Sequence, residues 1–113
     1  MCKVYVVNHS GHDISDAERY GKLVIMSHGV LNKFKVTRMY REMSETMKDS
    51  KETDYVLQSG PSVMCMVAAA AFAAKHQCLN LLIWREDAKK SRYIVRRLSF
   101  TQLKGEQEDD SRI

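Results

Sequence analysis

The sequence predicts a small Rossmann-like α/β domain with three layers, a mainly parallel sheet and an antiparallel edge strand at its C-terminus. Its 113 residues are enough for one hydrophobic core. Hydrophobic residues make up 44% of the chain and charged residues 28%, which is typical of a globular domain. Short β-branched runs alternate with helical patterns, and this alternation favours parallel strands joined by right-handed crossovers. We therefore expect residues 1–104 to form one domain, followed by a disordered acidic tail over 105–113.

The N-terminal part of the chain contains two strand patterns, each followed by a polar turn. The expected order is a strand over 3–7, a short helix or turn over 13–20 and a strand over 23–26. Asn8-His9-Ser10-Gly11 follows the first strand, and Ser27-His28-Gly29 follows the second. Gly21 closes the short segment between them.

A helix is expected from Thr37 to Lys48. Thr37 is a suitable N-cap because its hydroxyl can accept a hydrogen bond from the first turn. Tyr40, Met43 and Met47 lie at i, i+3 and i+7, which predicts that they form the stripe facing the core.

The second half of the chain predicts a strand over 55–57, a helix over 62–76, a strand over 79–84 and an antiparallel edge strand over 92–98. Pro61 suits the first turn of that helix, because its fixed φ fits and its missing N–H is not needed there. The helix is apolar almost all round and rich in alanine, so it must be covered on more than one side. We therefore expect a homodimer or a higher homo-oligomer. His76 ends the helix, where a cation would complement the helix dipole.

Charge is unevenly distributed along the chain. The tail from Gly105 carries four carboxylates against Arg112, a net charge of −3, which leaves +7 on the rest of the chain. Seven basic residues fall between Arg85 and Lys104. Such a patch either attracts an anionic partner or keeps an edge strand soluble and unpaired. Its limited extent favours a compact anionic ligand over a long nucleic acid.

Several classes of protein are disfavoured. No apolar run reaches the roughly 18 residues of a membrane span, and the N-terminus begins with a strand pattern rather than a signal peptide. Cys2, Cys65 and Cys78 form no CxxC pair, and their odd number argues against a disulfide scaffold. We expect a reduced, cytoplasmic protein.

The polar loops after the strands are the expected ligand site, because open parallel sheets bind ligands beyond the carboxyl ends of their strands. In the third loop, Gln58 to Ser62, Gly60 lets the backbone approach a ligand, and the helix start offers N–H groups to a phosphate. The same turn could connect a strand to a helix without binding anything. It has neither the Walker spacing nor G-x-G-x-x-G, so the sequence predicts no cofactor.

His9, His12 and His28 fall in the first two loops and are the candidates for catalysis. They could act as acids or bases near neutral pH. His9 and His12 could also ligate a metal together with Asp13, Asp16 or His28. H-x-x-H in a loop is unspecific, however, and we predict no metal site. The remaining alternatives are polar recognition of a ligand without catalysis and an Asx-type turn that caps the short helix.

Trp84 ends the fourth strand beside the basic turn. Together with Tyr93 it could stack on a base while Arg85 or Arg92 neutralises a phosphate, provided that these groups share a face. Otherwise the two aromatic residues close one end of the core.

Two resemblances bear on source and ligand. The stretch V-Y-V-V-N-H-S-G-H-D, from Val4 to Asp13, resembles the start of small bacteriophage proteins, and the resemblance extends to about Leu98. Residues 55–98 are similar in layout to CRISPR-associated α/β proteins that bind cyclic oligoadenylate, with a Ser59-Gly60-Pro61 turn, a small-residue helix and a basic hairpin. Trp84-Arg85 stands where that family tends to have Tyr-Asp, so no catalytic residue is carried over. Together the resemblances imply a phage protein that sequesters or degrades a nucleotide signal of host immunity.

The leading interpretation is a cytoplasmic, phage-encoded module with an anti-defence role, which sequesters a phosphorylated nucleotide or nucleotide-derived signal without a cofactor. The ligand-binding candidates are Asn8, His9, Ser10, His12, Ser59, Gly60, Ser62, Arg85, Arg92 and Arg96. One alternative is a nucleotide phosphodiesterase or related hydrolase that uses His9, His12 or His28. Another is an interaction protein that inhibits a partner and binds no small ligand.

Overall fold

The computed structural model describes residues 1–9, 11–27 and 34–100. Its elements in chain order are β1 (Lys3–Val6), the 3-10 helix η1 (Ser15–Arg19), β2 (Lys22–Ile25), α1 (Val36–Thr46), β3 (Tyr55–Leu57), α2 (Ser62–His76), β4 (Cys78–Arg85) and β5 (Arg92–Ser99). Ser10, His28 and the predicted tail over 105–113 lie outside the described residues.

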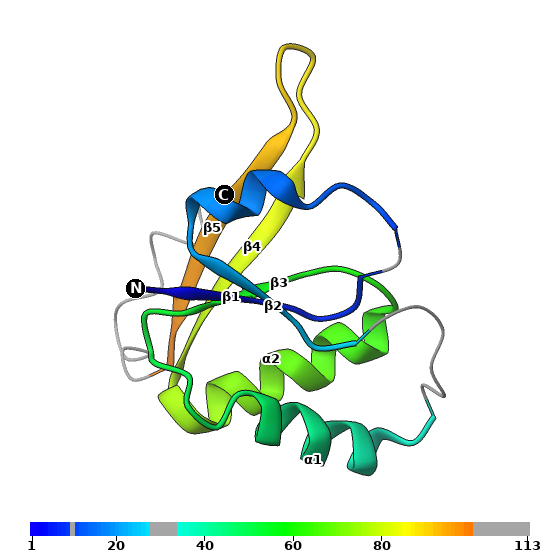
Figure 1. Cartoon of the computed structure of the whole chain (residues 1–113). Helices are drawn as coiled ribbons and strands as arrows, with labels where there is room; N and C mark the ends of the chain where they lie inside the picture. The colour runs from blue at the N-terminus through cyan, green and yellow to red at the C-terminus, as the bar shows by residue number, and fades with distance from the viewer. Residues whose placement is uncertain (10, 28–33, 101–113) are drawn as a thin grey trace.

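The strands form one five-stranded sheet in the order β2-β1-β3-β4-β5. The first four pair in parallel, and β5 pairs antiparallel with β4 at the edge. Helices α1 and α2 lie on one side of the sheet and η1 on the other (Figure 1). The predicted α/β fold and its antiparallel last strand are therefore confirmed. Because the chain passes from β1 to β2 and then back to β3 on the far side of β1, the winding reverses between β1 and β3.

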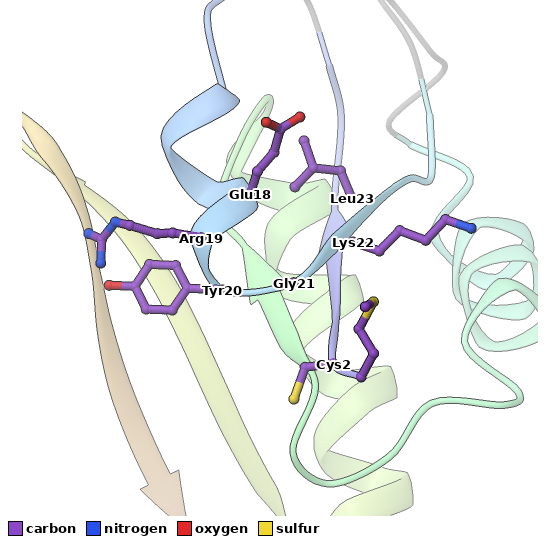
Figure 2. Close-up of a pocket in the computed structure, with 8 residues that line it drawn as sticks. Cys2, Glu18, Arg19, Tyr20, Gly21, Lys22 and Leu23 are labelled. Atoms are coloured by element: carbon purple, nitrogen blue, oxygen red, sulfur yellow. The ribbon is translucent and has the colours of Figure 1, made fainter.

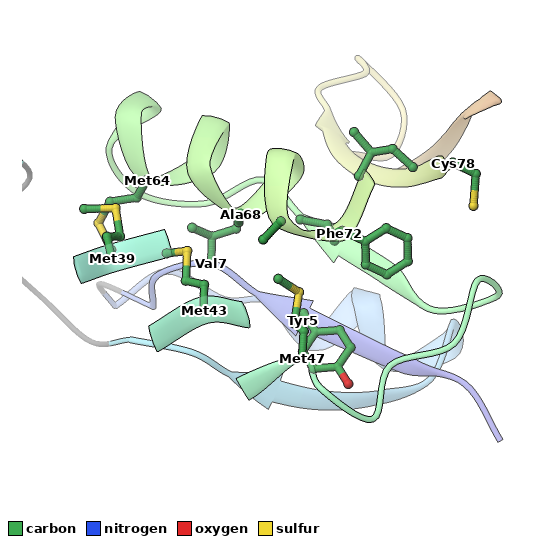
Figure 3. Packing of buried hydrophobic residues seen from close by; sticks show 12 residues of the cluster. Tyr5, Val7, Met39, Met43, Met47, Met64, Ala68, Phe72 and Cys78 are labelled. Carbon is green, nitrogen blue, oxygen red and sulfur yellow. The ribbon is translucent and has the colours of Figure 1, made fainter. Parts of the chain in front are cut away.

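Methionine and aromatic side chains fill the core between the sheet and the two helices (Figure 3). Tyr5 and Val7 point to this side because alternate residues of a strand face opposite ways. Met64 and Phe72 of α2 are 0% and 1% exposed and lie in the same cluster. This side of the sheet is therefore closed by well-buried side chains.

Helix α1 differs from the prediction at its start and along its buried face. It begins at Val36 without a side-chain cap, so the expected N-cap role of Thr37 is wrong. Its buried stripe is Met39, Met43 and Met47, whereas Tyr40 is 42% exposed. The reason is that α1 packs mainly against α2, and this turns Tyr40 to the rim of the helix pair. No helix among the described residues has the length and apolar character that crossing a membrane requires.

The opposite side of the sheet is covered by η1. Ile14 and Ala17 are buried there against Val4, Val6 and other strand residues of a second cluster. Because η1 is only 5 residues long, it contacts β2 and β5 and leaves Trp84 near the end of β4 43% exposed. The fold thus has three layers of unequal extent.

The start of the edge strand β5 is protected by side chains of the η1 segment. The Tyr93 N–H donates to Asp16 Oδ2 at 2.8 Å, and the Tyr93 carbonyl accepts hydrogen bonds from Arg19 and from the Tyr20 hydroxyl at 2.6 and 3.1 Å. The Val95 carbonyl accepts a bond from the neighbouring Arg96 guanidinium at 2.9 Å. These contacts occupy backbone groups that a further strand would need.

His76 has a different role from the predicted cation. Its Nε2 lies 2.8 Å from the hydroxyl of Ser50, and its ring packs on Phe72 with centroids 4.5 Å apart. Burial, followed by the nearby charge of Lys75, lowers the pKa of His76 below its ordinary value. His76 is therefore neutral at pH 7 and does not act as a charge at the helix end.

Candidate functional site

Polar loops after β1, β2 and β3 meet at the carboxyl edge of the sheet, as the sequence predicts. The His9 N–H donates to the Ser27 carbonyl at 2.9 Å, and the Ser27 hydroxyl donates to the Val7 carbonyl at 2.7 Å. These bonds fasten the loop after β2 to the loop after β1.

The loops after β1 and β3 are joined by a buried contact between Asn8 and Ser59. Asn8 is 1% and Ser59 7% exposed, and the Ser59 hydroxyl donates to the Asn8 carbonyl at 2.7 Å. Gly60 has a φ of +93°, and a Cβ there would lie 2.6 Å from the Cβ of Asn8. Only glycine fits such a position without a shift of the loops. The contact lies between β1 and β3, at the reversal of winding where open α/β sheets bind ligands.

A cleft of about 660 Å³ opens beside this contact, on the η1 side of the sheet. Its volume is within the roughly 300–1,000 Å³ typical of small-molecule sites. The cleft is formed by the η1 segment, the loop after β3 and the turn end of the β4–β5 hairpin. Its lining residues are His12, Asp13, Ser15, Asp16, Gln58, Ser59, Trp84, Glu86, Ser91 and Tyr93.

Two aromatic residues form one wall of the cleft. The rings of Trp84 and Tyr93 meet edge to face, with centroids 4.9 Å apart and an interplanar angle of 65°. Tyr93 is 4% exposed and anchors the pair, whereas Trp84 is 43% exposed. Burial raises the pKa of Tyr93, and the charges of Asp13 and Asp16 raise it further, so its phenol is neutral. The exposed indole is available as a platform for a planar group.

Aspartates of the η1 segment form another part of the cleft wall. The pKa of Asp13 is lowered by its hydrogen bonds with Ser15, whose N–H lies 2.9 Å from Asp13 Oδ1. The pKa of Asp16 is lowered by the bond from the Tyr93 N–H and further by Arg19, which lies 3.2 Å away. Both carboxylates are therefore ionised at neutral pH, and the interior of the cleft is acidic.

A family model of phage Pam3 gp32-like proteins matches residues 2–98 of the chain. The chain belongs to the phage Pam3 gp32-like family. The match includes every residue that lines the cleft. No curated protein and no solved structure matches the chain. The resemblance to small phage proteins is thus confirmed, whereas the similarity in layout to CRISPR-associated nucleotide-binding proteins stays a prediction.

In this phage Pam3 gp32-like chain, the predicted arginines and the aromatic pair lie on opposite faces of the β4–β5 hairpin. Trp84 is opposite Tyr93 in the ladder, and the next pair is Arg85 with Arg92. Because consecutive strand residues face opposite ways, these arginines point to the α2 side, and so does Arg96, opposite Leu81. The structure therefore does not bring the three arginines into the cleft with the aromatic wall.

The other predicted residues are placed at several depths. His12 and Ser59 line the cleft, Asn8 and Gly60 meet behind Ser59, and Ser62 is exposed at the first turn of α2. His9 is half-buried, and its Nε2 lies 3.0 Å from the His12 carbonyl, so its ring folds back on its own loop. Among the described residues, no group of three His, Cys, Asp or Glu side chains is placed to hold a metal.

Six residues that line the cleft were not among the predicted ligand contacts: Asp13, Ser15, Asp16, Gln58, Glu86 and Ser91. Gln58 directly follows β3, so its place at a carboxyl strand end was an available signal. The other five enter the cleft through the folding of the η1 segment and of the turn end of the hairpin, for which the sequence offers no local signal.

A second hollow, of about 670 Å³, lies at the opposite edge of the sheet, beside the start of β1 (Figure 2). The residues that line this hollow contact one another. The Lys22 N–H donates to the Cys2 carbonyl at 3.0 Å, and a side chain at Gly21 would collide with that same oxygen. The Arg19 guanidinium lies 4.4 Å from the Tyr20 ring centroid. Because parallel sheets bind ligands at the other edge, we assign no ligand to this hollow.

Proposed function

We propose that this member of the phage Pam3 gp32-like family is a binding module that sequesters a nucleotide or a nucleotide-derived signal in the cytoplasm of the infected host. The observation that carries the proposal is the exposed ring of Trp84 in a cleft at the reversal of winding, beside Gln58 and Ser59. A flat, partly polar ring is the kind of ligand that such a wall recognises, because stacking supplies affinity and the polar groups supply orientation.

The charge of the cleft constrains how a nucleotide would lie in it. The base would stack on Trp84, and its polar edge would face Gln58 and His12. Ionised Asp13 and Asp16 would repel a phosphate from the interior. We therefore place the phosphate outside the cleft, toward Ser62 at the start of α2. The N–H groups of that first turn have no side-chain cap within the described residues.

The acidic wall also selects among nucleotides. A cyclic or monophosphorylated ligand brings less negative charge near Asp13 and Asp16 than a triphosphate does. The proposal therefore favours ligands with few phosphates, and the ribose hydroxyls could donate to the aspartates.

Intrinsic fluorescence offers a direct test, because Trp84 is the only tryptophan of the chain. Nucleosides and mono-, tri- and cyclic nucleotides would be titrated while emission and thermal stability are recorded. A true ligand should quench or shift the emission and raise the unfolding temperature. Trp84→Ala should weaken binding by about 1–3 kcal/mol, the usual value of a base–aromatic stack. Calorimetry would measure that loss, because this variant has no emission to follow.

Phe100→Ala is the matched control, since Phe100 is an exposed aromatic residue outside the cleft. It should bind as the parent chain does. If no nucleotide changes the emission or the stability, or if both variants bind equally well, the proposal is wrong. Recovery of the ligand intact supports sequestration, whereas conversion that disappears in His12→Ala would establish the hydrolase alternative.

A further inference from the structure

The outer surface of the α1–α2 pair is apolar, although it faces away from the sheet. A hollow of about 360 Å³ between the two helices is lined by Val36, Thr37, Tyr40, Val63, Met66, Val67 and Ala70. A second hollow of about 250 Å³ continues it along the helices and shares Tyr40. We call these two hollows and their lining the helical groove.

The helical groove is unusual for a surface exposed to water. Met66 is 70% exposed, and Val36 and Tyr40 are 43% and 42% exposed. Helix α2 carries no charged side chain from Ser62 to Ala74, so its outer face has no polar residues of the kind that cover a solvated helix. Apolar side chains gathered in this way on a domain surface mark a site of association.

We infer that the helical groove is the interface of a homodimer, in which α2 packs antiparallel to α2 of a second copy about a two-fold axis near Ala70. This inference is independent of the proposed ligand, because the groove and the cleft lie on opposite sides of the sheet.

The shape of α2 suits a second copy. Met66, Ala70 and Ala74 follow one another at intervals of four residues and therefore lie along one exposed stripe of the helix. In an antiparallel pair centred on Ala70, Met66 lies opposite Ala74 of the partner subunit, and the reverse contact is made as well. One large side chain thus meets one small side chain twice, which is the self-complementarity that a two-fold interface requires. Alanine at the centre lets the helix axes approach closely.

Charge on α1 is complementary in the same arrangement. The exposed side of α1 carries Arg38 and Arg41 in its first half and Glu42 and Glu45 in its second half. Within one chain, Arg38 pairs with Glu42 and Glu45 with Lys48, each at 3.1 Å and on the exposed surface, so a second copy would share these charges. Antiparallel packing brings the basic half of one α1 toward the acidic half of the other. Because the groove itself is lined by uncharged residues apart from Lys75, two copies do not repel each other at the centre. A strongly charged partner would find no counter-charge there.

Sedimentation velocity and light scattering of the full chain over a concentration series test the inference. We expect a species of twice 13.0 kDa at high concentration. Met66→Glu should raise the dissociation constant by about tenfold or more, because it places a charge in the buried centre. Met66 is mostly exposed within one chain, so the variant should keep its circular dichroism spectrum and unfolding midpoint.

Val95→Glu is the matched control, because it introduces the same charge at an exposed apolar residue of β5. It should dimerise as the parent chain does. A parent chain that stays monomeric throughout the series overturns the inference, and so does a dimer that Met66→Glu leaves unchanged or that Val95→Glu dissociates equally.

Cross-linking tests the axis itself. Ala70→Cys should be joined efficiently between chains by a short bismaleimide, because the two copies of residue 70 face each other. Ser62→Cys, exposed two turns away on the same helix, should not be, and the parent chain measures the background from its native cysteines. Equal cross-linking of the two variants would exclude this packing.

Discussion

The two faces of the sheet are closed in different ways. On the α1–α2 face, buried apolar side chains such as Met64 and Phe72 fill a continuous core. On the η1 face, Ile14 and Ala17 are buried against the strands with Tyr20 packed beside them. Asp16 accepts a hydrogen bond from the Tyr93 N–H of β5, and Arg19 donates one to the Tyr93 carbonyl.

This difference separates the source of stability from the site of ligand access. The two helices bury a continuous cluster of side chains against the sheet, whereas the 5-residue 3-10 helix leaves the cleft between itself and the turn end of the hairpin. We therefore expect substitutions on the α1–α2 face to lower mainly the free energy of unfolding. Substitutions on the η1 face should cost less stability and change the cleft more.

The largest expected effect is that of Phe72→Ala. Phe72 is 1% exposed in the core of the α1–α2 face, and its removal should lower the free energy of unfolding by about 3–5 kcal/mol. Phe100→Ala removes the same ring from a residue that is 36% exposed and should cost less, about 1–2 kcal/mol. Urea unfolding followed by circular dichroism measures both. Similar losses would mean that the α1–α2 face is not the main source of stability.

Glycine substitutions probe the junction of the loops that lie beside the cleft. Gly60→Ala should cost about 1–3 kcal/mol for its positive φ, and the collision with Asn8 should add to this cost. Gly11→Ala is the matched control, because its φ is +105° but a Cβ there meets no described atom within 4 Å. The difference between the two free energies of unfolding isolates the contact with Asn8. Equal losses would show that the contact is easily relieved.

The succession of strands and helices along the chain could be predicted from short-range patterns, such as the turn at Gly60 and Pro61, whereas the order of the strands within the sheet was not predicted. The residues that form the buried stripe of α1 could not be predicted from the sequence. Met39 and Tyr40 are adjacent, and either one completes an apolar helical stripe with Met43 and Met47. The choice depends on where α2 lies beside α1, and no local pattern carries that information.

The candidate site was predictable to a similar extent. Ser59 and His12 were predicted because ligand loops follow parallel strands, and both line the cleft. The faces of Trp84 and Arg85 depend on the hairpin register, since a shift of one residue exchanges the two sides. The bond between Asp16 and Tyr93 joins residues 77 positions apart, a distance over which sequence patterns provide no pairing signal.

A smaller effect is expected at Asp16, whose bond to Tyr93 fastens η1 to β5. Asp16→Ala should lower the free energy of unfolding by about 1 kcal/mol, because the released N–H at this edge can still reach water. It should also remove an acidic group from the cleft and so strengthen the binding of more highly phosphorylated ligands. Glu18→Ala, an exposed neighbour on η1, is the control for both measurements. Asp16→Ala without effect on stability or ligand preference would show that the wall does not depend on this carboxylate.

The response to pH should distinguish the two faces, with the smallest effect at His76. The folded state lowers the pKa of His76, mainly by burial and then by Lys75, against opposing effects of Asp54 and Glu52. The unfolded chain therefore binds a proton more readily, and stability should fall as the pH drops below about 6.5, the ordinary pKa of histidine. The Asp16 pKa is also lowered, but its contribution should be lost only below the ordinary aspartate range, as the pH passes through its folded value.

Acidification should thus weaken the α1–α2 face first, through His76 and its bond to Ser50, and the η1 face only at much lower pH. His76→Gln removes the titrating group and keeps a polar side chain, so it should abolish the slope of unfolding free energy between about pH 7 and 5. Asp16→Ala should leave that slope intact and flatten the one below about pH 4. Urea unfolding at a series of pH values measures both slopes. If His76→Gln retains the upper slope, another group titrates there, and neutral His76 is not what stabilises the end of α2.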